Sequence, residues 1–204
     1  MKNLSKHPSF FHNFFICIFL RKSDSMKNSY IFFRHALTRI DKEQPAEKWV
    51  ISDEGIQEAC EVISSGKFDD VDVIISSSEK KAIQTAYYLA ERIEKEIILN
   101  PNFKELDRGH DFIESKEDYE TMVWRIFNNR TECSFGWETA EKALARFKRG
   151  IARIENTYSD KKIFIVSHGI VLTLYYAELH GWDLGETFKQ WKELPFCGYK
   201  IIQE

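Results

Sequence analysis

Two histidines in this sequence stand where a buried strand is expected to end. His35 follows the apolar run 31–33 and Arg34, and His168 follows the apolar run 162–166. A guanidinium can bind two phosphate oxygens at once, and a neutral imidazole can attack phosphorus to form a covalent phosphohistidine. These residue types together indicate the binding and the transfer of a phosphoryl group.

A pair of lysines follows another apolar run. Lys80 and Lys81 lie in SSSEKKAIQTA (76–86), after the run 71–75 and at the start of an expected helix. Helix N-termini offer free N–H groups and the positive end of the helix dipole, which also attract anions. Either lysine can serve as the phosphate ligand on this pattern.

A carboxylic acid is also needed near the phosphate, because the leaving alcohol of a phosphate ester takes up a proton. Glu105 lies in KELDRG, a loop after the apolar run 96–99 that could reach the pocket. Taken alone, each of these residues has an ordinary explanation, as a cap, a solvated helix start or a surface carboxylate. Their occurrence at successive strand ends is what favours a site.

Alternating strands and helices must position these groups. Expected strands are 29–33, 71–75, 96–99, 162–166 and the edge strand 199–202; expected helices follow Ser52 and cover 79–94, 116–128, 139–158 and 169–179. This alternation predicts the α/β class, as a three-layer α/β/α sandwich with a mostly parallel central sheet. In such folds ligands bind at the carboxyl ends of the strands, where the candidate residues lie.

The composition narrows the function classes. The 204 residues are 43% hydrophobic and 30% charged, as in one globular domain, and the formal net charge of -3 argues against a nucleic-acid partner. The 4 cysteines show no paired metal-ligand spacing, so neither a zinc site nor a disulfide framework is expected. Reduced thiols favour a cytoplasmic protein.

The first 25 residues differ from the rest of the chain. They hold the apolar segment FFHNFFICIFL between basic residues, which is shorter than the ~20 residues that span a bilayer. We favour translation from Met26 or a loose extension over 1–25, with the domain at 26–204. An export signal or membrane anchor is the alternative, and a membrane partner is not expected.

The same segments resemble motifs of the histidine phosphatase superfamily, the phosphoglycerate mutase-like proteins. RHALT (34–38) resembles its Arg-His-Gly-Glu-Thr motif, SSSEKKAIQTA its Ser-Ser-Pro-Leu-x-Arg-Ala-x-Gln-Thr-Ala segment, and ELDRG its Glu-x-x-x-Gly segment. GWETAEKALARF (136–147) resembles its Gly-Glu-Ser…Arg helix start, and IFIVSHGIVL its Val-Ser-His-Gly segment. The motifs follow the family's order and cover residues 29 to about 180.

The resemblance implies a phosphoglycerate mutase-like fold and phosphoryl transfer that needs neither a metal nor a cofactor. His35 would be the nucleophile and Glu105 the proton donor, with His168 stabilising charge on the phosphoryl oxygens. The phosphate-binding residues that it implies are Arg34, Lys81, His168, Thr38 and Gly169.

The sequence departs from this pattern in three places. Ala36-Leu37 replaces Gly-Glu, Ser78-Glu79 replaces Pro-Leu, and Lys81 stands where the family usually has a second arginine. Lysine keeps the charge but loses the planar fork, so weaker phosphate binding is expected.

Two functions of different classes follow from these patterns. The first is a phosphomonoesterase that acts on a small phosphorylated metabolite or a phosphoprotein, because the span 100–135 leaves room for only a modest lid and a short lid favours hydrolysis. The second is a module that binds a phosphorylated ligand with little turnover. Retention of both histidines and Glu105 favours the enzyme. The substrate and the oligomeric state are left open.

Overall fold

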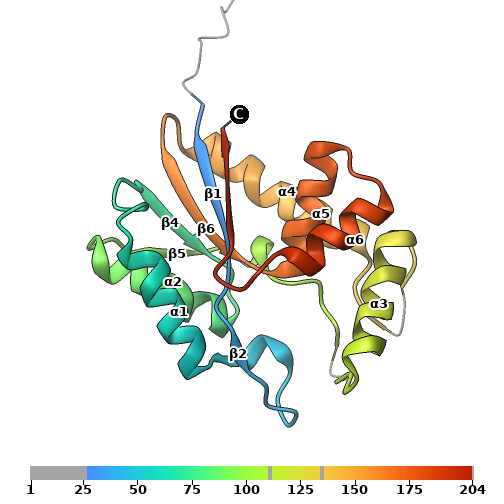
Figure 1. The fold of residues 1–204 in the computed structure, drawn as a ribbon. Helices are drawn as coiled ribbons and strands as arrows, with labels where there is room; N and C mark the ends of the chain where they lie inside the picture. Colours follow the sequence, from blue (N-terminus) through green and yellow to red (C-terminus); the bar gives the residue numbers. More distant parts are fainter. Residues whose placement is uncertain (1–26, 110–111, 134–135, 204) are drawn as a thin grey trace, which may run out of the picture.

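The computed structural model describes residues 27–109, 112–133 and 136–203. The expected extension 1–25 lies outside them. A five-stranded sheet with the order β5-β4-β6-β1-β7 forms the centre of the molecule (Figure 1). Its strands are β1 (Ser29–Arg34), β4 (Val73–Ser76), β5 (Ile97–Leu99), β6 (Lys162–Ser167) and β7 (Tyr199–Gln203). Only β7 runs antiparallel, against β1, which confirms the predicted edge strand and the mostly parallel sheet.

Helices cover both faces of this sheet, as the predicted sandwich requires. Figure 1 shows α1 (Asp53–Ser64) and α2 (Lys80–Arg92) on one side. The other side carries α3 (Lys116–Asn128), α4 (Ala140–Thr157), α5 (Gly169–His180) and α6 (Leu184–Glu193). Side chains of β1 alternate between two cores: Ile31 and Phe33 join the α1–α2 core, and Tyr30 and Phe32 join the other. This alternation is the period-2 pattern of a strand that is buried on both faces.

The helices begin where their capping residues allow. The Ser52 side chain accepts a hydrogen bond from Gly55 N at 3.1 Å and starts α1, as predicted. Thr139 caps α4 in the same way. The helix α6 was not expected, although Asp183 is a typical N-cap residue and accepts from Glu186 N at 2.8 Å.

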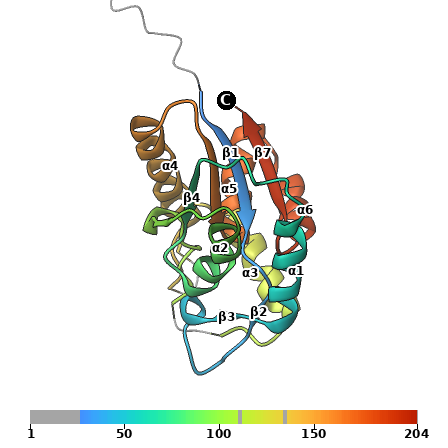
Figure 2. The same cartoon turned by 90° about the vertical axis from the view of Figure 1, so that its left-hand side faces the viewer.

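A short antiparallel ribbon and two 3-10 turns complete the described chain. The ribbon pairs β2 (Thr38–Arg39) with β3 (Val50–Ile51) and lies beyond the carboxyl end of β1 (Figure 2). The turns are η1 (Ala46–Lys48) and η2 (Pro101–Phe103). Strands of two residues carry too little hydrophobic pattern to be found from sequence.

Two predictions for the whole chain, reduced cysteines and no membrane-spanning segment, can be compared only with the described residues. Cys60, Cys133 and Cys197 are free thiols, whereas the remaining cysteine, Cys17, lies outside the description. Within the described ranges, no helix combines the length and the apolar character that crossing a bilayer requires.

One glycine lets α4 approach the loop that follows β5. A Cβ added at Gly150 would lie 2.8 Å from the ring of Phe103, which is fully buried in η2. The close approach therefore sets where the chain leaves η2 and enters the Glu105 loop.

Gly150→Ala should lower the free energy of unfolding by about 1–3 kcal/mol, because overpacking outweighs the better helix propensity of alanine. Gly185→Ala is the matched control in α6, since its Cβ would meet only Asp183 Oδ1 at 3.5 Å. That variant should gain up to about 1 kcal/mol. Urea unfolding of both variants measures the difference, and equal shifts of the same sign would contradict the packing argument.

Candidate active site

Strand register brings the predicted residues to one edge of the sheet. Arg34 of β1 pairs with Ser167 of β6, and Ser76 of β4 pairs with Val166. The residues that follow these strands therefore emerge side by side, and the rings of His35 and His168 lie 5.0 Å apart between centroids. A cavity of about 1280 Å³ opens at this edge. The predicted residues that line it are Arg34, His35, Thr38, Lys81, Glu105 and Gly169.

His35 is held in the orientation that a nucleophile needs. Its Nδ1 lies 2.8 Å from the carbonyl oxygen of Ala36, which can only accept, so Nδ1 carries the proton. The lone pair of the neutral ring is then on Nε2. Burial lowers the pKa of His35 well below its usual value, and the charges of His168, Lys81 and Arg34 lower it further. The ring is therefore neutral near pH 7 and keeps that lone pair.

Backbone contacts fix the segment that carries His35. The His35 amide donates to Ser167 O at 3.0 Å, which continues the β1–β6 pairing. The Ala36 amide donates to Thr85 Oγ1 at 3.0 Å, and that hydroxyl donates to Lys81 O at 2.8 Å. Thr85, an ordinary helix residue in the sequence, thus ties the histidine loop to the helix that carries Lys81.

Arg34 is clamped by the segment between α6 and β7. Its Nη1 donates to the carbonyl oxygen of Leu194, and its guanidinium carbon lies 4.1 Å from the ring centroid of Phe196. A Cβ at Gly169 would lie 3.2 Å from that carbon, so any larger residue would push the guanidinium away from this position. The Nε of Arg34 is buried and has no partner among the described residues, which leaves a donor for a bound anion.

His168 lies behind the cavity rather than in its wall. Its ring is fully buried, and Nε2 lies 2.7 Å from Ser77 Oγ. Within the described chain Nδ1 has no hydrogen-bond partner. Burial lowers the pKa of His168 well below its usual value, followed by the charges of Lys81 and Arg146. The structure thus brings His168 to His35, but His168 is not among the described residues that line the cavity.

Glu105 lies at the start of α5. Its carboxylate accepts hydrogen bonds from the amides of Ile170, Val171 and Leu106 at 3.0, 3.1 and 2.9 Å. Burial raises the pKa of Glu105, and this effect outweighs the opposing effect of the amide donors. A carboxyl group of this kind holds a proton more readily than one on the surface.

Arg146 and Glu138 anchor the loop that carries Glu105. Arg146 donates to the carbonyl oxygens of Asn102, Lys104 and Glu105 at 2.9–3.1 Å and to Glu138 Oε2 at 2.8 Å. Both side chains of the pair are 18% exposed. Arg146 is largely shielded from solvent, because its guanidinium fills the space under the loop and satisfies the carbonyl groups of the loop.

The structure decides between the two lysines. Lys80 is exposed, whereas Lys81 is buried and lines the cavity. The ammonium of Lys81 is already engaged: it donates to Ala46 O at 2.7 Å and forms a buried ion pair with Glu79. Glu79 is a residue that the sequence showed only as a departure from the Pro-Leu pattern.

The outer part of the cavity is aromatic. The guanidinium of Arg108 lies 5.8, 5.3 and 5.8 Å from the ring centroids of Trp49, Tyr119 and Trp137. Arg108, Trp49 and both other rings line the cavity. Trp124 does not line the cavity and packs on Phe188 instead.

A match to a known family covers this site and most of the chain. Residues 30–199 match the histidine phosphatase superfamily (branch 1). The chain belongs to this superfamily. The resemblance read from the motifs is thereby confirmed, and the phosphoglycerate mutase-like fold is confirmed with it.

Similar proteins of the superfamily are named as phosphatases. The chain is 29% identical over 113 residues to the uncharacterized phosphatase PhoE of Bacillus subtilis (strain 168), and the match spans 55% of either chain. The match thus spans only about half the length of this curated relative.

Solved structures share the fold at lower identity. A mycobacterial glucosyl-3-phosphoglycerate phosphatase with VO3 has a TM-score of 0.68 at 19% identity, covering 86% of this chain and 92% of its own. A phosphoserine phosphatase from Entamoeba histolytica has a TM-score of 0.64 at 24% identity, covering 85% and 89%. YhfR of Bacillus stearothermophilus has a TM-score of 0.69 at 18% identity, covering 86% and 91%.

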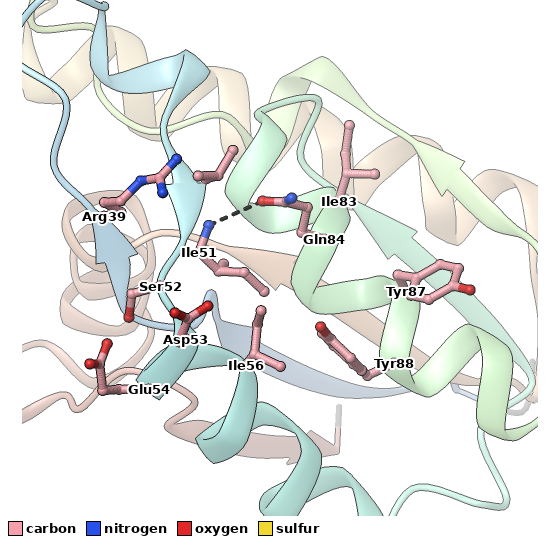
Figure 3. Close-up of a pocket in the computed structure, with 11 residues that line it drawn as sticks. Arg39, Ile51, Ser52, Asp53, Glu54, Ile56, Ile83, Gln84, Tyr87 and Tyr88 are labelled. Carbon is pink, nitrogen blue, oxygen red and sulfur yellow. Dashed lines mark hydrogen bonds between the residues drawn. The ribbon is translucent and has the colours of Figure 1, made fainter.

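This member of the superfamily has a second cavity, of about 610 Å³, lined by residues of the β2–β3 ribbon, α1 and α2 (Figure 3). Arg39, Tyr87 and Tyr88 line it, and Ile51 N donates to Gln84 Oε1 at 3.1 Å across its upper wall. None of the described histidines borders it, and the residues predicted to serve catalysis line the larger cavity or lie beside it.

The buried histidines make stability depend on pH. With lowered pKa values, the folded chain binds fewer protons than the unfolded chain below about pH 6.5. Stability is therefore highest above that pH and falls as the pH is lowered toward the folded pKa. For one histidine the fall is about 1.4 kcal/mol per pH unit within this window.

His35→Asn, which keeps a donor for Ala36 O, should show a smaller loss of stability than wild type between about pH 7.5 and pH 5. Guanidinium unfolding at both pH values measures it. The exposed His180 provides the control, because His180→Asn should follow wild type. An equal fall in all three proteins would contradict a neutral, buried His35.

Proposed function

We propose that this chain hydrolyses phosphomonoesters through a phosphohistidine at His35, without a metal ion. The observation that carries the proposal is the state of His35, whose Nδ1 is bound to Ala36 O while the ring lines a cavity beside Arg34 and Lys81. The nucleophilic lone pair and the cations that would hold the phosphoryl oxygens thus belong to one pocket.

In the first step, Nε2 of His35 attacks phosphorus and the bond between phosphorus and the ester oxygen breaks. The leaving alkoxide takes the proton of Glu105, a role that its raised pKa supports. Arg34 and Lys81 bind the equatorial oxygens as the phosphoryl group passes between the oxygen and the nitrogen. The His168 ring packs against the His35 ring, with 5.0 Å between the centroids.

In the second step, water attacks the phosphohistidine. Glu105, now a carboxylate, takes a proton from the water, and the bond between phosphorus and Nε2 breaks to restore neutral His35. The product is inorganic phosphate. The amides at the start of α5 stabilise the Glu105 carboxylate between the two steps.

The substrate class is a small phosphorylated metabolite or a phosphoprotein. The cavity of about 1280 Å³ exceeds what a phosphate alone fills, and its outer wall offers Arg108 and the rings around it. The named phosphatases of similar fold act on phosphoserine and on glucosyl-3-phosphoglycerate, which are small phosphorylated metabolites.

His35→Ala should lower the hydrolysis of a chromogenic aryl phosphate at least about 1,000-fold, because the nucleophile is lost. The assay is run in EDTA, where wild type should keep its full rate. His180→Ala is the control for a histidine outside the site. Loss of the wild-type rate in EDTA, or survival of the rate in His35→Ala, would contradict the mechanism.

Glu105→Gln tests the proton donor by its dependence on the leaving group. Hydrolysis of an alkyl phosphate should fall about 100-fold or more, whereas an aryl phosphate, whose leaving group needs little protonation, should lose much less. Both substrates are assayed on the same protein sample. Equal losses would indicate that Glu105 acts only as the cap of α5, since a structural defect affects both substrates alike.

A binding module is the second candidate, and the buried pair of Glu79 with Lys81 is the observation that favours it. A cation that is already neutralised contributes less to phosphoryl transfer. Vanadate binding by His35→Ala and turnover by wild type together separate the two candidates. If the protein is a binding module, His35→Ala still binds vanadate and wild type shows no turnover. If it is an enzyme, wild type shows turnover and His35→Ala shows none.

A further inference from the structure

Glu79 places a carboxylate inside the phosphate pocket. It is the N-cap residue of α2, yet its side chain makes no capping hydrogen bond and is 4% exposed. One oxygen is paired with the ammonium of Lys81. The other accepts from the amide of Glu105 at 2.7 Å and lies 3.6 Å from Nε2 of His168. The carboxylate therefore contacts two of the side chains expected to serve catalysis, Lys81 and His168, and the backbone of a third residue, Glu105.

Glu79 lines the cavity, whereas His168 does not. The carboxylate thus occupies the position from which a phosphoryl oxygen would reach both Lys81 and His168. The two departures noted in this segment are coupled by the contact, because a buried ammonium needs a counter-ion when no ligand is bound. Glu79 supplies it in the ligand-free chain.

Several elements present a charged or titratable group to Glu79. Lys81 comes from α2, His35 from the end of β1, and His168 from the start of α5. The loop after η2 presents Glu105 and Lys104. Burial raises the pKa of Glu79, but Lys81 and the Glu105 amide lower it by more, so Glu79 is ionised near neutral pH in the empty pocket.

A phosphoryl dianion that enters this pocket meets an anion in contact with its ligands. Two negative charges in contact with the same ligands repel each other, and uptake of a proton by the Glu79 carboxylate removes this repulsion. Protonated Glu79 can then donate a hydrogen bond to a phosphoryl oxygen, and Lys81 is released to bind the same group.

On the basis of the proposed function, we propose that Glu79 couples the binding of a phosphoryl dianion to the uptake of one proton from water. Lys81 then exchanges its carboxylate partner for the phosphoryl group. The pocket accordingly selects against dianions as the pH rises, with an affinity change of up to about tenfold per pH unit from this one proton.

Sulfate is the probe, because its charge does not change over the pH range in which the protein is folded. Calorimetric titration in buffers of different ionisation enthalpy gives the protons taken up per bound sulfate. Wild type should take up one proton more than Glu79→Gln, whatever His35 and His168 contribute to both. Glu79→Gln should also bind sulfate about tenfold or more tightly at neutral pH.

Glu47→Gln is the matched control. Glu47 lines the same cavity and pairs with Lys104 at 2.9 Å, but its side chain is 49% exposed. The Glu47→Gln substitution removes one negative charge, as Glu79→Gln does, but it leaves the contacts of Lys81 unchanged. The proton uptake of Glu47→Gln should therefore equal that of wild type. Glu79→Leu combined with Lys81→Arg restores the family residues at these two positions. This double variant provides the test if Glu79→Gln does not fold, and it should also take up one proton fewer per bound sulfate than wild type.

Equal proton uptake in wild type and both Glu79 variants would overturn the inference while leaving the proposed function intact. Uptake that changes equally in Glu47→Gln would also overturn it, since the effect would then belong to the overall charge of the cavity. If wild type and all variants bind neither sulfate nor phosphate, the pocket is no phosphate site and the proposed function fails with the inference.

Discussion

The site depends above all on the register between β1 and β6. Arg34 lies opposite Ser167, so the next residue of each strand leaves the sheet at the same level, and His35 and His168 meet with their rings 5.0 Å apart. A shift of one residue would turn every side chain of β1 to the other face and exchange its two cores. The hydrophobic alternation of β1 therefore holds the catalytic geometry as well as the fold.

Distant segments then hold each group in its working position. Arg34 is gripped from the end of α6, the His35 loop by Thr85 of α2, and the Glu105 loop by Arg146 of α4. The sheet separates α2 from α4 and α6, so the site is complete only when both helical layers are packed. Within the site, burial keeps the imidazoles neutral, as a nucleophile requires. Burial also raises the pKa of Glu105, as a proton donor requires.

The sequence predicted the elements whose pattern is local. Apolar runs and helical stripes predicted the strands of the sheet and its principal helices. The motifs predicted six residues that line one cavity in the structure. The helix α6 was not predicted, because few of its residues are apolar. The contact of Phe196 with Arg34 joins residues far apart in the chain and leaves no local signal. Glu79 was visible as a departure, but its pairing with Lys81 required the fold.

The central claim is that His35 carries the phosphoryl group during turnover. Its most direct test is to stop the reaction with a phosphate ester in strong alkali, digest the protein and locate the added phosphoryl mass by mass spectrometry. The account predicts a modification on the peptide containing His35 that survives alkali and is lost in acid. A protein that turns over substrate yet carries its label on another residue would contradict it, as would a protein that carries no label when hydrolysis of the intermediate is the slow step.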